Sequence, residues 1–147
     1  MNTEDLMIGD WVRNIADGKP IKVYEILCSG INPTYYQMSD EIEDYIHCDE
    51  IEPIPLTPEL LEKIGFEEVK GMWHQKDRLF RISSYEYVRF YKHSAVHTED
   101  EVGLVDSVGD CGDYGYEDNY LCDVQYVHKL QHAIKLFEMK LEKEIEL

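Results

Sequence analysis

The histidines are the residues whose spacing most suggests chemistry, and that chemistry would be metal binding. His128 and His132 are four residues apart, and His93 and His97 repeat this spacing. Residues four apart project from the same side of a helix, where two zinc ligands could lie together. No glutamate follows His128, as a zinc-protease helix would require. A composite site, with or without Cys111, is one hypothesis, but surface histidines are the simpler interpretation, so we expect no metal or other cofactor.

A second candidate is the glycine-rich acidic stretch. Gly109, Gly112 and Gly115 repeat every three residues, which superficially suggests a phosphate-binding loop. Such a loop needs a nearby cation, whereas acidic residues surround these glycines. The acidic spacing also lacks the alternation that calcium loops use. We therefore predict a flexible hairpin tip over residues 109–119.

Catalytic patterns are weak. Ser83 and Ser84 are not in a nucleophile elbow, and no cysteine has an evident histidine partner. A stripe of alternating residues could stack nucleic-acid bases, although a sheet face covered by a helix has the same pattern; its members are Tyr85, Tyr87, Arg89 and Tyr91. We predict a protein that is not an enzyme, while a triad assembled in space stays open.

The net charge of the chain indicates which classes of partner it can bind. The formal net charge is −17, from 31 acidic and 14 basic residues among 147. Such a chain repels phosphate backbones and anionic membrane surfaces, so we expect no direct nucleic-acid or membrane binding. A solvated acidic surface is the simplest interpretation, and binding of a basic protein or mimicry of a polyanion are the alternatives. The sequence has no signal-peptide pattern or apolar run of transmembrane length, and its four cysteines form no C-x-x-C pair; these features predict a cytoplasmic protein with reduced thiols.

The elements that must position these residues fall into two predicted modules of an α+β protein. Residues 1–56 contain several short strand patterns divided by turn residues, which favours a small SH3-like β-barrel. Residues 57–147 predict a short helix, an antiparallel sheet and a longer helix over 125–139 with one apolar face. The tail 143–147 fits either an edge strand or an extension of that helix.

The junction between the modules carries a helix with clear start and stop signals. Thr57 is suited to the N-cap, and Pro58 to the first helical position, where a missing N–H costs nothing. Gly65 is placed to adopt the left-handed conformation that ends a helix. We predict a short helix over 58–64.

Four segments of the chain resemble a family of small proteins from gut bacteria and from their phages and mobile elements. They are 51–66, 71–73, 126–134 and 143–147. The family has no assigned activity, and the shared motifs are structural. The resemblance implies a bacterial cytoplasm as the setting, under possible phage or mobile-element control, and implies no mechanism.

The leading functional hypothesis is a non-enzymatic protein-interaction module. The segment 99–123 holds nine acidic residues and no Lys or Arg, so it could bind a basic host protein. The candidate contact residues are those of the barrel rim and of this segment: Trp11, Tyr35, Tyr36, Asp110, Asp113, Glu117 and Asp118. The alternatives are a metal protein or enzyme that uses His128 and His132, and a structural or assembly component. The oligomeric state is left open.

Overall fold

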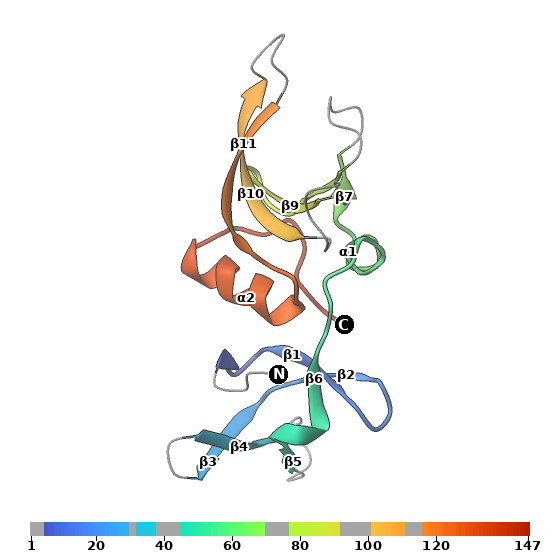
Figure 1. Cartoon of the computed structure of the whole chain (residues 1–147), viewed down its shortest axis with the longest axis vertical. Helices are drawn as coiled ribbons and strands as arrows, with labels where there is room; N and C mark the ends of the chain where they lie inside the picture. Colours follow the sequence, from blue (N-terminus) through green and yellow to red (C-terminus); the bar gives the residue numbers. More distant parts are fainter. Residues whose placement is uncertain (1–4, 30–31, 38–44, 70–76, 92–100, 111–115) are drawn as a thin grey trace. The chain divides into compact units, whose positions relative to one another are not determined.

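The computed structural model describes residues 5–29, 32–37, 45–69, 77–91, 101–110 and 116–147 (Figure 1). For 27–29, 32–37, 107–110 and 116–118 it describes the backbone. The chain divides into two compact units: unit 1 is Met1–Pro55, Tyr126–Gln131 and Leu147, and unit 2 is Leu56–Gln125 and His132–Glu146. The expected second module contained all of 57–147, whereas Tyr126–Gln131 lies with unit 1.

Unit 1 contains two three-stranded antiparallel sheets. The first has the order β2-β1-β6 and the second the order β3-β4-β5. Their elements are β1 (Trp11–Asn14), β2 (Pro20–Lys22), β3 (Glu25–Ser29), β4 (Asn32–Gln37), β5 (Tyr45–His47), the 3-10 helix η2 (Cys48–Glu50) and β6 (Ile51–Pro53). With the helices of the chain, these sheets confirm the α+β class. The described strands form open sheets, so the closed SH3-like barrel is not confirmed.

A small apolar core holds unit 1 together. Leu6, Val12, Val23 and Ile51 are almost fully buried in one cluster, and half-buried side chains including Cys48 pack against it. Residues 15–19 form the turn that joins β1 to β2. Gly18 adopts a φ of 69° there, a left-handed conformation that glycine tolerates without strain.

Unit 2 begins with the helix that the junction predicted. Helix α1 (Pro58–Ile64) has Thr57 as N-cap, and the Thr57 hydroxyl accepts a hydrogen bond from the Leu60 amide at 3.2 Å. Gly65 ends the helix with a φ of 109°. The local prediction for this helix is confirmed at both ends.

The five-stranded antiparallel sheet of unit 2 has the order β11-β10-β9-β8-β7. Its strands are β7 (Glu67–Glu68), β8 (Arg78–Arg81), β9 (Glu86–Phe90), β10 (Val102–Asp110) and β11 (Tyr116–Asp123). Phe80, Val88 and Leu104 are paired across three neighbouring strands and are fully buried, so one face of the sheet forms the core.

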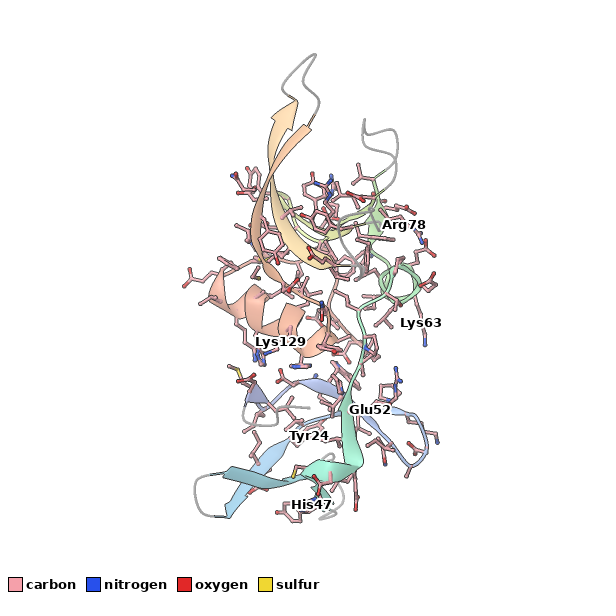
Figure 2. All side chains as sticks on the ribbon, viewed as in Figure 1. Tyr24, His47, Glu52, Lys63, Arg78 and Lys129 are labelled. Carbon is pink, nitrogen blue, oxygen red and sulfur yellow. The ribbon has the colours of Figure 1, made fainter. Side chains whose placement is uncertain are left out.

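An arginine connects α1 to this sheet. Arg78 donates two hydrogen bonds at 2.9 Å to Glu68 of β7 and one at 2.7 Å to Glu62 of α1 (Figure 2). The hydrogen bond to Glu68 is the largest influence that raises the pKa of Arg78 above its usual value. The fork geometry of the guanidinium suits two carboxylates from different elements.

The last helix is shorter than expected. Helix α2 spans Val127–Leu136, whereas the sequence predicted 125–139. The chain leaves the helix at Glu138, which has a φ of 51°, and the Met139 amide then donates to the Ile134 carbonyl at 3.0 Å. This is the six-to-one bond of a Schellman ending, formed without glycine. The predicted apolar face is confirmed at Val127, Leu130 and Ala133, which are buried. Phe137 belonged to the same predicted face but is 40% exposed, because it lies beyond the last helical residue.

The tail after α2 has no regular secondary structure. Neither the edge strand nor the helical extension proposed for 143–147 forms. The tail still packs within unit 2, because the Glu142 amide donates to the Ile82 carbonyl at 2.9 Å and Ile145 is buried.

Candidate functional site

The acidic segment folds as a two-stranded ribbon. Strands β10 and β11 pair from Gly103↔Asp123 to Asp110↔Tyr116. The loop predicted over 109–119 was therefore too long, because residues 109–110 and 116–119 belong to the strands. Cross-strand backbone pairing forms these strands despite the glycine content. The tip at 111–115, and the mobility predicted for it, lie outside the described residues.

The far half of this ribbon extends past the rest of the sheet. Strand β9 pairs with β10 only from Val102 to Asp106, so among the described residues β10 beyond Asp106 is paired with β11 alone. Figure 1 shows the ribbon continuing beyond β9 in unit 2. Strand β11 is an edge strand of the sheet. Within the part of the chain that the structure describes, the far half of the ribbon therefore has no third strand beside it.

The charge of the ribbon has one sign. Its strands carry no Lys or Arg, and their acidic residues are Asp106, Asp110, Glu117, Asp118 and Asp123. Three of the predicted contact residues, Asp110, Glu117 and Asp118, therefore lie on paired strands. The fourth acidic one, Asp113, lies outside the described residues.

The base of the ribbon is packed with aromatic side chains. A Cβ placed on Gly103 would lie 2.7 Å from Cε2 of Tyr120 and 3.1 Å from Cε2 of Tyr91, so both rings cover this glycine. Burial, followed by a hydrogen bond to Asp123, raises the pKa of Tyr120 to about 12. Burial, followed by the Asp123 charge, also raises the pKa of the Cys122 thiol. The neutral forms of both groups are favoured here.

The stripe of Tyr85, Tyr87, Arg89 and Tyr91 was expected along one face of a strand, but Tyr85 lies outside that strand. Tyr85 precedes β9 and is 71% exposed, whereas Arg89 lies 4.6 Å above the Tyr91 ring. Arg89 also donates to Asp77 at 2.6 Å and 2.9 Å. The one cation of the stripe is therefore already neutralised by a carboxylate, which disfavours phosphate binding at this face.

The aromatic residues proposed at the barrel rim lie in unit 1. Trp11 is only 8% exposed, and Lys22 Nζ lies 5.6 Å from its ring centroid. Trp11 is thus mainly a core residue, and a partner would reach Lys22 more readily. Tyr35 and Tyr36 lie on β4, where they pair with His47 and Ile46 of β5. Their role in binding stays a prediction.

Both histidines of the pair on α2 are at least partly buried, and metal binding by them stays a prediction. His128 is 2% exposed and stacks on Tyr126, with ring centroids 5.9 Å apart. His132 is half-buried. His93, His97 and Cys111 lie outside the described residues, so the composite site stays a prediction.

Sequence reasoning missed another set of donors. Across the described part of the chain, the one group of three potential metal-binding side chains is His47, Cys48 and Asp49 in unit 1. The signal was available, because three different donor types stand in a row at the end of a predicted strand. Its consecutive spacing differs from the spacing of four residues by which two ligands share one side of a helix.

Comparison with known proteins returned no matching family model, no similar curated protein and no similar solved structure. Among the described residues, no helix is long and apolar enough to cross a membrane.

Proposed function

We propose that this protein is a non-enzymatic interaction module that binds a basic protein partner through the β10–β11 ribbon. The observation that supports this most is the combination of shape and charge. The ribbon extends past β9, and its strands carry five acidic residues with no basic residue to offset them. An extended arm with one sign of charge can enter a groove lined by Lys and Arg.

The acidic side chains of the edge strand β11 favour recognition by charge over the addition of a partner strand. Edge strands that carry acidic side chains resist pairing with another sheet, because like charges accumulate and must be desolvated. The acidic groups instead attract cations over a distance of about one Debye length, roughly 10 Å at 0.1 M salt. The sharper form of the proposal is that the ribbon imitates the charge of a nucleic acid and blocks a basic host protein.

The proposed setting is a bacterial cytoplasm, with the gene carried by a phage or mobile element. This setting is supported by the resemblance of four segments to small proteins of that origin.

We also propose that unit 1 is an SH3-like barrel. Strand β2 of one sheet and strand β3 of the other are separated by only two residues, Val23 and Tyr24. In orthogonally packed sheets and small barrels, the chain passes from one sheet to the next at such a bend.

A salt-dependent pull-down with matched baits tests the proposal. The ribbon variant replaces Asp106, Asp110 and Asp118 by Asn and Glu117 by Gln. The control variant changes the net charge equally at exposed positions elsewhere, with Glu59, Glu67, Glu138 and Glu144 replaced by Gln. Each bait is incubated with nuclease-treated bacterial lysate at low and high salt, and captured proteins are identified by mass spectrometry.

The expected result is a basic protein that is captured by the natural chain and by the control variant. It should be lost with the ribbon variant and at high salt, because screening removes long-range attraction. Capture that survives high salt, or that both variants retain equally, contradicts the proposal. Bound zinc in the purified chain that disappears with His132→Ala would instead favour the metal-protein alternative, and stable homo-oligomers would favour an assembly component.

A further inference from the structure

The turn after β5 brings three different metal-binding groups together. Strand β5 ends at His47, whose backbone position is fixed by pairing with Tyr35 of β4. The 3-10 helix η2 begins at Cys48, which packs against the core of unit 1. The Asp49 side chain is 86% exposed and that of His47 is 35% exposed. One donor is thus held by the core, and the other two can be reached from solvent.

The donor atoms of the three side chains lie near one another. His47 Nδ1 lies 3.8 Å from Cys48 Sγ and 3.3 Å from Asp49 Oδ2. Cys48 Sγ lies 3.9 Å from Asp49 Oδ1. Zinc bonds of about 2.0–2.3 Å at tetrahedral angles place the donor atoms roughly 3.3–3.6 Å apart. One ligand atom from each side chain lies within 4.8 Å of the other two, so side-chain rotations would have to draw these atoms together for a metal to bond to all three.

We propose that His47, Cys48 and Asp49 form a binding site for a divalent transition-metal ion of the zinc and cobalt type. A thiolate and an imidazole select such ions over magnesium and calcium, which prefer oxygen donors alone. The carboxylate supplies the third ligand, and water from the exposed side supplies the fourth. This site is separate from the acidic ribbon and does not depend on the function proposed for it.

If these residues had only a structural role, they would need different side-chain groups from those that metal binding needs. His47 is also the N-cap of η2, because its Nδ1 accepts a hydrogen bond from the Asp49 amide at 3.1 Å. Capping needs only an acceptor at position 47 and makes no use of the Cys48 sulfur. Metal binding uses the same nitrogen lone pair, requires the thiolate, and strengthens as pH rises because the thiol and the imidazole must lose their protons. Cys48 therefore separates the two roles.

Cobalt titration of the reduced, full chain tests the proposal. We expect a thiolate-to-cobalt charge-transfer band that saturates at one ion per chain and that Zn²⁺ abolishes by displacement. Cys48→Ser should remove the band, and Cys122→Ser, a matched change at a half-buried cysteine of unit 2, should keep it. His47→Asn keeps a capping acceptor but lacks the imidazole, so it should bind Zn²⁺ at least about tenfold more weakly.

A measurement on the unmodified chain tests the proposal without relying on variants that could misfold. Zn²⁺ should slow alkylation of Cys48 by iodoacetamide, and a chelator should restore the rate, as read by mass spectrometry of the peptide that contains it. The proposal is overturned if the natural chain gives no band, if Cys48→Ser retains it, or if Zn²⁺ leaves the alkylation rate of Cys48 unchanged.

Discussion

The side chain of Gln131 is hydrogen-bonded to the backbone of Trp11, 120 residues earlier in the chain. Its Oε1 accepts from the Trp11 amide at 3.0 Å, and its Nε2 donates to the Gly9 carbonyl at 3.0 Å. Both bonds lie within unit 1. One amide side chain therefore satisfies a donor and an acceptor of the segment that leads into β1, as a neighbouring strand would do.

Replacing Gln131 by Leu should destabilise unit 1 by about 2 kcal/mol, because a partly buried amide and carbonyl would lose their partners. The measurement is urea unfolding followed by tryptophan fluorescence in a Trp73→Phe background, where Trp11 is the remaining tryptophan. Gln125→Leu, at an exposed position just before α2, is the control and should change little. Equal effects of the two substitutions would contradict the role given to Gln131.

Replacing Glu138 by Gly should stabilise unit 2 by about 1 kcal/mol. Glu138 has a φ of 51° at the end of α2, a conformation that glycine adopts without strain. Glu138→Gln removes the charge near the helix C-terminus but keeps the strained backbone, so it separates the two effects. A gain with Gln as large as that with Gly would show that charge, not conformation, is responsible. Thermal unfolding of the three chains provides the comparison.

Replacing Gly103 by Ala should destabilise unit 2 by about 1–3 kcal/mol, because the new methyl group would overlap the Tyr120 ring. In a Tyr120→Ala background the loss should be smaller, since that ring is then absent. A double-mutant cycle by urea unfolding should give a coupling energy of at least about 0.5 kcal/mol. Additive losses would indicate that the overlap is relieved elsewhere.

The stability of unit 2 should fall in strongly alkaline solution because of Tyr120. Its pKa is raised to about 12 in the folded chain from an ordinary value of 10.0, with burial as the largest cause. A group with a raised pKa contributes stability that is complete below its unfolded pKa and is lost as pH rises through its folded pKa. The loss attributable to Tyr120 should therefore occur between about pH 10 and pH 12. Tyr120→Phe should lose this part of the pH dependence in urea unfolding, and an unchanged profile would refute the assignment.

Local features of the fold could be predicted from the sequence. The signals of α1 reside in Thr57, Pro58 and Gly65 themselves, because capping depends on neighbours within one turn. The end of α2 shows the limit of such signals. Glu138 carries no mark of a helix end, and contacts made by the surrounding structure impose its left-handed backbone at an energetic cost.

The long-range features could not be predicted, since they depend on which segments meet. No pattern in Tyr126–Gln131 indicated that it belongs with unit 1 rather than with the sheet that precedes it. The acidic ribbon was identified by charge, but glycine content alone suggested a loop where cross-strand pairing forms strands. The His47–Asp49 group was missed because its spacing is set by a 3-10 turn and not by an α-helix.

The placement of Tyr126–Gln131 has a consequence for the order of biosynthesis. A ribosome releases β1 to β6 early, but the segment that completes unit 1 emerges only after every strand of the five-stranded sheet. Domains usually fold as they emerge, the N-terminal one first. The first-made strands therefore lack Tyr126–Gln131 while the sheet of unit 2 is being made, so whatever recognises the surface that this segment completes would meet it only after Gln131 has left the ribosome.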